Sequence, residues 1–239
     1  MNVLIINGSP RGQKSNSLRL SKAFAEGALD ATGEGELKVL DVSSLRIESC
    51  RGCFYCWQNK EGDCVIEDDQ EQFLSSRVWA DLTVWSFPLY YAGVPGHLKT
   101  AIDRQLSFSS PVKKANQPSL KKKKQVVIST CGYGELKNSY DGVRALFAHL
   151  CEGGNYDAIF CAQGELLRQP LPPFVPDQVA RRIAGYVDTV RQAGRQWASV
   201  GITVETRRAL DEPLIPIDVY ESMAKAAGGK AAPSGGRQT

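Results

Sequence analysis

The amino-acid sequence predicts a doubly wound α/β domain: a five-stranded parallel sheet with helices on both faces. Five short apolar runs have the pattern of strands that are buried on both sides. Segments with apolar residues at helical spacing lie between these runs. Strands that alternate with helices form parallel sheets, and 239 residues suffice for one such domain with a full core.

The first strand is expected at Asn2–Asn7, a continuous apolar run. A polar loop then leads into a helix that turns Leu20, Phe24 and Ala28 to one face. The other elements alternate along the chain: strands from 36 and at 81–88, 125–130 and 156–164, and helices from near 69 and at 96–106, 140–151 and 177–200. The helix near 69 is expected because Asp68 and Glu71 have the spacing of a capping box and would carry Phe73, Leu74 and Val78 inward.

The pattern weakens after Gly201, and the low-complexity stretch 228–239 is typical of a disordered end. We therefore expect one domain at 1–204 and a C-terminal extension at 205–239. The sequence shows no internal repeat.

Composition and charge exclude several classes of function. A net charge of +3 is too small to predict a nucleic-acid partner. The longest apolar runs are too short to cross a bilayer, so no membrane partner is expected. Met1 leads directly into a strand without a signal-peptide pattern, which predicts a cytoplasmic protein with reduced thiols. The basic run Lys121–Lys124, with Lys113 and Lys114 upstream, favours a solvated loop, with a phosphate site as the alternative.

Three loops are candidates for a binding site. In doubly wound sheets, ligands bind beyond the carboxyl ends of the strands. The loops Gly8–Ser17, Pro88–Gly96 and Cys131–Gly134 each follow an expected strand directly. This rule selects one edge of the sheet for the site.

The first of these loops has the chemistry of a phosphate site. Gly8 lets the backbone turn sharply, and the following serine and asparagine side chains offer hydrogen-bond donors. The N–H groups and the positive dipole end of the next helix point the same way, and Arg11 adds a charge. A capped helix start would use the same polar residues, so that alternative stays open. Gln13 replaces the second glycine of the NTPase phosphate loop, and no dinucleotide G-x-G-x-x-G motif is present.

Four segments, IINGSPRGQKSNS, CRGCFYCW, DCVIEDD and PLYYAGVPGHLKTAIDR, occur in this order within roughly residues 1–105, with weaker support from STCGYG. Together they resemble the flavodoxin-like, NAD(P)H-dependent FMN reductase family, including its iron–sulfur flavoprotein branch. The resemblance implies an enzyme in which NAD(P)H reduces FMN and electrons pass to a quinone, a flavin or another small-molecule acceptor. It also implies a homodimer or homotetramer.

The resemblance further implies which residues bind FMN. The phosphate is expected on Ser9, Arg11, Ser15, Asn16 and Ser17; the ribityl chain and ring against Pro88, Leu89, Tyr90 and Tyr91; and Cys131, Gly132 and Tyr133 beside the ring. The two tyrosines independently offer flat aromatic surface for stacking, although core or interface packing would use them too. No side chain is assigned a catalytic role, because the flavin carries the redox step.

Four of the seven cysteines, Cys50, Cys53, Cys56 and Cys64, lie in one short run. Compact runs of this kind hold iron–sulfur clusters, and the resemblance to the iron–sulfur branch implies a [4Fe–4S] cluster. Bulky aromatic residues between the cysteines favour free thiols with packing and redox roles instead, and a zinc site is a third interpretation. The corresponding alternatives to an FMN reductase are an iron–sulfur flavoprotein electron carrier and a non-catalytic redox sensor.

Overall fold

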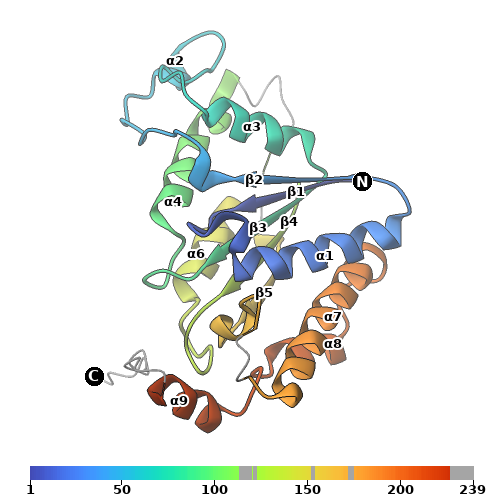
Figure 1. Ribbon diagram of the computed structural model, residues 1–239. Helices are drawn as coiled ribbons and strands as arrows, with labels where there is room; N and C mark the ends of the chain where they lie inside the picture. The colour runs from blue at the N-terminus through green and yellow to red at the C-terminus, as the bar shows by residue number, and fades with distance from the viewer. Residues whose placement is uncertain (113–119, 121–122, 152–153, 172–174, 227–239) are drawn as a thin grey trace.

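The computed structural model describes residues 1–112, 120, 123–151, 154–171 and 175–226. Its centre is a five-stranded parallel sheet in the order β2-β1-β3-β4-β5 (Figure 1). The strands are β1 (Asn2–Asn7), β2 (Glu36–Asp41), β3 (Leu82–Pro88), β4 (Lys124–Thr130) and β5 (Asp157–Cys161). This architecture confirms the fold class predicted from the sequence.

Helices cover both faces of the sheet (Figure 1). On one face lie α1 (Asn16–Thr32), α7 (Asp177–Ser199) and α8 (Val204–Asp211); on the other lie α3 (Gln70–Trp79), α4 (Gly96–Asp103) and α6 (Asp141–Leu150). Short 3₁₀ turns occur at Gly12–Lys14, Val42–Ser44, Arg104–Ser109 and Gly164–Leu167. The strands β1, β3 and β4 are buried along almost their whole length, which explains the apolar residues at their centres.

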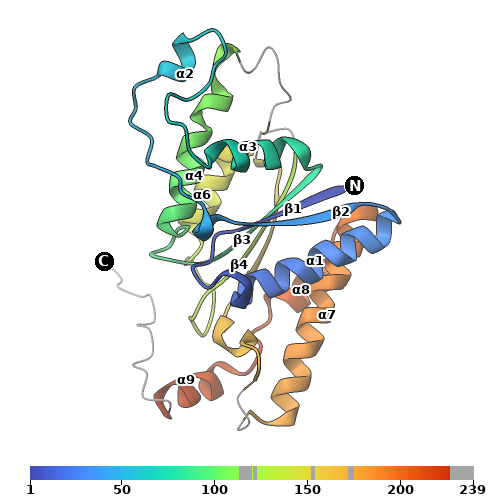
Figure 2. The ribbon, with the colours of Figure 1, turned by 45° about the horizontal axis from the view of Figure 1, so that its top comes forward.

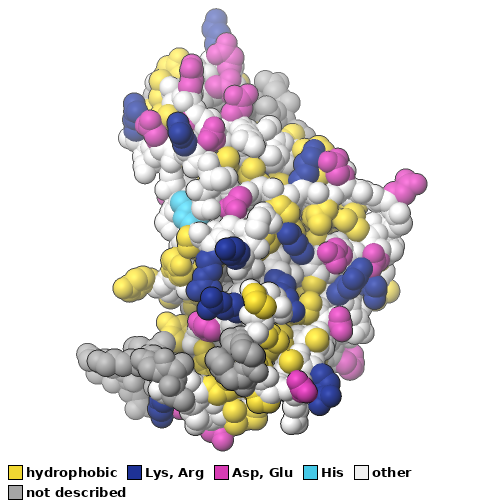
Figure 3. Space-filling view, in the orientation of Figure 1, with side chains coloured by type: hydrophobic (Ala, Val, Ile, Leu, Met, Phe, Trp, Pro, Cys, Tyr) yellow, Lys and Arg dark blue, Asp and Glu magenta, His cyan; other side chains and the backbone are white. Residues whose placement is uncertain are grey.

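Two helices stand apart from these layers. The short α2 (Tyr55–Gln58) lies in a loop that projects beyond α3 and α4, and α9 (Ile217–Ala226) lies near the end of the described chain, away from the helices that cover the sheet (Figures 1 and 2). The extension expected from residue 205 begins inside α8. The expected disorder of residues 228–239 lies outside the described residues, and the domain division remains a prediction. Among the described residues, no helix is both long and apolar enough to span a membrane. On the face drawn in Figure 3, Lys and Arg side chains are interspersed with Asp and Glu side chains.

The start of α3 differs from the expected capping box. The Asp68 carboxylate accepts a hydrogen bond from the Gln70 N–H at 3.1 Å, but it also pairs with Arg104, and the helix buries Arg77 rather than Val78. Burial lowers the pKa of Arg77 to about 10. Its guanidinium donates to the side-chain oxygens of Gln105 and Gln125 and so is not left without partners.

The described part of the lysine run serves the fold. Lys123 Nζ donates to the carbonyl oxygens of Val78 and Ala80 at the end of α3, and Lys124 Nζ lies 5.3 Å from the centre of the Trp197 ring. Lys123 is therefore engaged by the backbone of α3. Lys113, Lys114, Lys121 and Lys122 lie outside the described residues.

Candidate functional site

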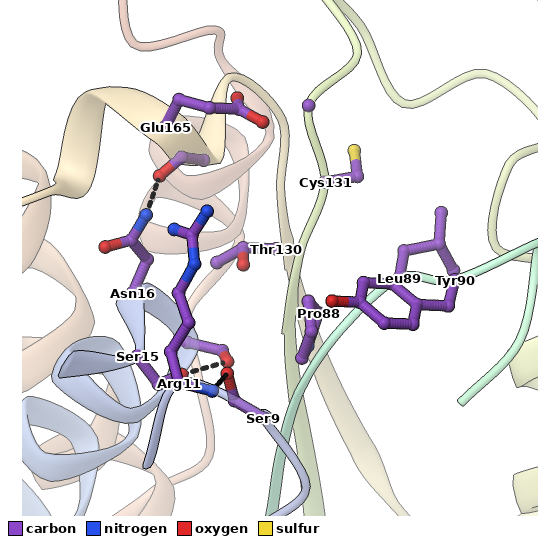
Figure 4. A pocket seen from close by; sticks show the side chains of 13 residues that line it. Ser9, Arg11, Ser15, Asn16, Pro88, Leu89, Tyr90, Thr130, Cys131 and Glu165 are labelled. Carbon is purple, nitrogen blue, oxygen red and sulfur yellow. Dashed lines mark hydrogen bonds between the residues drawn. The ribbon is translucent and has the colours of Figure 1, made fainter. Parts of the chain in front are cut away.

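A pocket opens where β1, β3, β4 and β5 end at the carboxyl edge of the sheet (Figure 4). Its empty volume, which includes the open solvent at its mouth, is ≈ 540 Å³. The pocket is lined by Ser9, Arg11, Ser15, Asn16, Ser17, Pro88, Leu89, Tyr90, Thr130, Cys131, Gly132, Gly164 and Glu165. All but two of the residues that the sequence predicted to bind FMN therefore come together around one cavity.

The two exceptions are Tyr91 and Tyr133. Tyr91 is fully exposed at the tip of a tight turn, in which Tyr91 and Ala92 both adopt left-handed backbone conformations. Reciprocal hydrogen bonds of 3.0 and 2.8 Å between Tyr90 and Gly93 close that turn. Tyr133 instead packs, half-buried, against the core beneath α3, α4 and α6.

The start of α1 presents buried hydroxyl groups to the pocket. The Ser15 and Ser17 hydroxyl oxygens lie 2.9 Å apart, and Ser15 Oγ accepts a hydrogen bond from the Leu18 N–H at 3.2 Å. The bond from the Arg19 N–H to the Ser15 carbonyl begins the helical hydrogen-bond pattern, so the N–H groups of Asn16 and Ser17 have no acceptor within the helix. Ser15 thus caps the helix, as one of the two interpretations of this loop expected, and it also lines the pocket. The phosphate site itself stays a prediction.

The loop before α1 is held by its own hydrogen bonds. Asn7 Nδ2 donates to the Gly12 carbonyl at 3.1 Å, the Ser9 N–H to Asn7 Oδ1 at 3.2 Å, and the Arg11 N–H to Ser9 Oγ at 3.3 Å. These bonds fix the loop before any ligand arrives, and this pre-organisation lowers the entropy cost of binding.

Gly8 is required for a reason other than the sharp turn expected from the sequence. A Cβ atom at this position would lie 2.5 Å from Leu98 Cδ2, a contact that real Cβ atoms do not make. The glycine therefore lets α4 pack against the strand end beside the pocket.

Sequence reasoning missed the loop after β5, which contributes Gly164 and Glu165 to the pocket. The predicted fifth strand ran through residue 164, whereas β5 ends at Cys161, so the prediction placed loop residues inside a strand. The same edge rule would have found this loop if the strand had been ended correctly. Asn16 Nδ2 donates to the Gly164 carbonyl at 2.7 Å and ties the loop to α1 (Figure 4).

Opposite α1, Cys131 contributes a thiol to the pocket wall (Figure 4). Burial raises the pKa of the Cys131 thiol, so this side chain stays neutral at physiological pH. A neutral, polarisable thiol is compatible with a flat aromatic ligand lying against it.

The cysteine segment, residues 45–68, carries the other cluster predicted from the sequence. Cys50 and Cys53 are exposed, Cys64 is half-buried and Cys56 is buried. Burial raises the pKa of Cys56, and the nearby Cys64, Cys50 and Cys53 raise it further, so these three thiols are close enough to act on Cys56 electrostatically. Among the described residues, however, no three His, Cys, Asp or Glu side chains are placed to hold a metal ion. The thiols as arranged do not fit a zinc site, and they would have to close around Cys56 to hold a cluster.

Arg104, at the end of α4, holds this segment. Its guanidinium makes two hydrogen bonds to the Asp68 carboxylate, of 2.9 and 3.1 Å, and further bonds to the carbonyl oxygens of Glu48 and Ile66. Both charged side chains are nearly inaccessible, at 1% and 8% exposure. Burial alone would lower the pKa of Arg104, but Asp68 and the thiol of Cys64 hold it above its usual value.

The family model for the flavodoxin-like fold matches residues 1–152. This chain belongs to the flavodoxin-like family. An iron–sulfur flavoprotein of Methanocaldococcus jannaschii is 36% identical over 104 residues, which are 44% of this chain and 50% of the relative. The chain spans about half the length of the curated relatives it matches. These matches confirm the resemblance to the flavodoxin-like FMN reductases and their iron–sulfur branch.

Solved structures share the fold at low sequence identity. An NAD(P)H:quinone oxidoreductase from Methanothermobacter marburgensis has a TM-score of 0.56 at 19% identity and covers 82% of this chain and 95% of its own. An FMN-dependent NADH-azoreductase from Bacillus anthracis, solved in complex with FMN, has a TM-score of 0.53 at 17% identity, with coverage of 83% and 100%.

Proposed function

We propose that this protein is an FMN-dependent oxidoreductase that takes electrons from NAD(P)H and passes them to a quinone, a flavin or another small acceptor. The observation that carries the proposal is the arrangement of the pocket. Ser9 in the loop after β1 and Ser15 and Ser17 at the start of α1 line the same cavity as Pro88–Tyr90 and Cys131. Phosphate donors at one end and apolar surface at the other match a flavin mononucleotide.

The residues present fit the phosphate group. Serine hydroxyls, two N–H groups in the first turn of α1 and the helix dipole all favour a negative charge. Arg11, which lines the same pocket, would pair with the phosphate oxygens. Beyond them, Pro88, Leu89 and Tyr90 offer apolar surface to a ring and exclude water from it. Bound FMN would supply the chemistry, since it accepts hydride and releases electrons in one- or two-electron steps.

FMN rather than FAD is the expected flavin, because the chain has one phosphate-type loop and no dinucleotide-binding motif. The test is to release the cofactor from native protein, separate it by chromatography, and follow NAD(P)H oxidation with quinone, flavin and azo acceptors. Recovery of FMN with acceptor-dependent NAD(P)H oxidation would support the proposal. Recovery of mainly FAD, or no flavin binding after reconstitution, would contradict it.

A second candidate function is that of an iron–sulfur flavoprotein that carries electrons between proteins. It is supported by the run of four cysteines between residues 50 and 64 and by the curated relatives of that name. Its test is to count iron and sulfide in protein prepared without oxygen. About four of each per chain, as a [4Fe–4S] cluster requires, would favour it.

Single Cys→Ala variants separate the two candidates. If Cys50, Cys53, Cys56 and Cys64 bind a cluster, each variant loses all bound iron, whereas Cys151→Ala and Cys161→Ala keep it as matched controls. If the thiols are free, iron is low in every protein and each thiol reacts according to its own exposure. NAD(P)H oxidation by the iron-free protein would show that the flavin site acts alone.

A cytoplasmic location, the absence of a nucleic-acid partner, and assembly as a homodimer or homotetramer remain predictions. Light scattering tests the assembly.

A further inference from the structure

Glu165 places a carboxylate on the wall of the pocket. It lies in the loop after β5, and in Figure 4 its side chain extends across the end of the cavity opposite Ser9. A Cβ atom at Gly132 would lie 2.4 Å from Glu165 Oε1, so the carboxylate rests directly against the backbone of the loop after β4. Within the described part of the chain, no Lys or Arg forms an ion pair with Glu165, although Arg11 lines the same pocket.

Tyr220, on α9, holds this carboxylate in place. Its hydroxyl group lies 2.9 Å from Glu165 Oε2 and 3.0 Å from the Gly132 carbonyl oxygen. Burial, and then the adjacent Glu165 charge, raises the pKa of Tyr220, so the hydroxyl keeps its proton and remains a donor. One proton is thus shared by two acceptors that both belong to the pocket wall.

The contact is not a chance approach of a loose helix, because the chain leading into α9 is anchored in the domain. The buried Gln163 side chain makes two hydrogen bonds of 2.9 Å with the backbone of Ile215, one as donor and one as acceptor. Leu214 and Ile215 are buried in the core. Ile217 Cγ2 would lie 3.2 Å from a Cβ at Gly134, so α9 starts tightly against the same loop.

A fixed negative charge beside the pocket affects what happens there on reduction. Hydride from NAD(P)H carries two electrons and one proton, so its uptake leaves NAD(P)⁺ and adds one negative charge to the pocket. Like charges in a protein environment raise each other's energy over distances of about 10 Å. A carboxylate on the wall therefore disfavours the reduced state relative to the oxidised one.

We propose that Glu165, positioned by Tyr220 of α9, lowers the reduction potential of the flavin bound in this pocket and so makes it a stronger reductant. The proposal rests on the proposed FMN site and assigns two residues to tuning it, Glu165 through its charge and Tyr220 as a positioning residue. The segment after α8 would thus influence the reduction potential of a flavin bound at the edge of the sheet.

The experiment compares FMN-loaded parent protein with Glu165→Gln, Tyr220→Phe and the double variant. For each protein, the dissociation constant of oxidised FMN and the midpoint potential of the bound flavin are measured. The matched control is Ser222→Ala, since Ser222 lies on α9 and its hydroxyl donates to the Asp218 carbonyl at 2.8 Å, away from the pocket.

Glu165→Gln removes the charge at constant shape, and it is expected to raise the affinity for reduced relative to oxidised FMN about tenfold. That change corresponds to a rise in potential of about 30 mV for a two-electron couple. Tyr220→Phe is expected to change the potential in the same direction by less, because the released carboxylate turns toward water. In the Glu165→Gln background it should add nothing, and Ser222→Ala should match the parent.

Two results overturn the inference and are distinguishable from each other. If FMN binds but Glu165→Gln leaves the potential unchanged, or Tyr220→Phe behaves like Ser222→Ala, the tuning role is wrong while the proposed function stands. If the parent protein binds no flavin, the proposed function fails and the inference fails with it.

Discussion

The pocket and the cysteine segment are the two regions richest in sequence motifs, and they are built in opposite ways. The pocket is assembled from loops that each follow a strand of one sheet, and hydrogen bonds within and between these loops hold it. The cysteine segment lies outside the sheet, and its main buried attachment is the ion pair of Asp68 with Arg104, 36 residues further along the chain.

This difference shows in which regions a sequence motif is sufficient to predict the positions of side chains. The carboxyl ends of parallel strands lie at the same edge of a sheet, so the residues that follow these strands lie close together in space. A segment outside the sheet takes its shape from tertiary contacts that no local pattern encodes. The predictions below test whether the two regions are as independent as the structure indicates.

The largest expected effect comes from Arg104→Gln. Removing Arg104 leaves the buried Asp68 carboxylate without its charged partner and should lower the free energy of unfolding by about 3 kcal/mol. Because Arg104 lines no part of the pocket, FMN affinity should stay within about twofold. Chemical unfolding and flavin titration measure the two quantities.

The matched control for Arg104→Gln is Lys99→Gln on the same helix, which breaks the exposed Lys99–Asp103 pair. It should cost less than about 0.5 kcal/mol. A parallel loss of stability and of FMN affinity in Arg104→Gln would show that the two regions are coupled.

The second prediction concerns the reactivity of the thiols. At pH 8, Cys50 and Cys53 should react with a thiol reagent at least about a hundredfold faster than Cys161, because burial raises the pKa of Cys161 to about 12 and keeps it protonated. Mass spectrometry of protein quenched at successive times gives the order. Joint protection of Cys50, Cys53, Cys56 and Cys64 would instead indicate that they ligate a metal.

The third prediction is the pH dependence of the Arg104–Asp68 pair. Burial alone would raise the pKa of Asp68, but hydrogen bonds from Arg104 and from the N–H groups of Glu48 and Gln70 hold it below its usual value. A carboxyl group with a lowered folded-state pKa contributes stability above its unfolded pKa of about 4, and this contribution disappears as the pH falls through the folded value.

The difference in unfolding free energy between parent and Asp68→Asn should accordingly be constant above about pH 5 and shrink below about pH 4. The contributions of the other carboxylates to the pH dependence are the same in both proteins and cancel in this difference. Asp103→Asn, in the exposed pair, is the control and should differ little from the parent across the range. A difference that persists unchanged to pH 2 would mean that the Asp68 charge does not hold the segment.

The smallest expected effects distinguish the two roles of the serines at the start of α1. Ser17→Ala should weaken FMN binding about tenfold, since a hydrogen bond to a charged group contributes about 1.5–3 kcal/mol. Ser15→Ala should weaken binding similarly and also destabilise the flavin-free protein by about 1 kcal/mol, because Ser15 caps the helix. Equal stability of the two flavin-free variants would contradict the capping role of Ser15. Unchanged flavin affinity would contradict the proposed phosphate site.

Much of the fold and most of the pocket could be predicted from the sequence because these features depend on local patterns. The run at Asn2–Asn7 is apolar on both faces, as a central strand must be, and the polar loop after it can only begin the next helix. The residues that sequence reasoning missed or misassigned have partners far away. Val78 was expected inward from helical spacing, yet Arg77 is the buried residue, because Gln105 and Gln125 supply acceptors inside the core.

The sequence by itself determined the class of fold, the edge of the sheet at which the pocket lies, and the polar loop between β1 and α1, because strand and helix patterns depend on residues within a few positions of each other. Only the tertiary structure decided that Arg104 holds the cysteine segment and that Tyr220 orients Glu165. Those partners are 36 and 55 residues apart, and their pairing depends on how the packed elements place side chains in space. A local sequence pattern does not show which distant residues come into contact, whereas the packing of the folded core determines it.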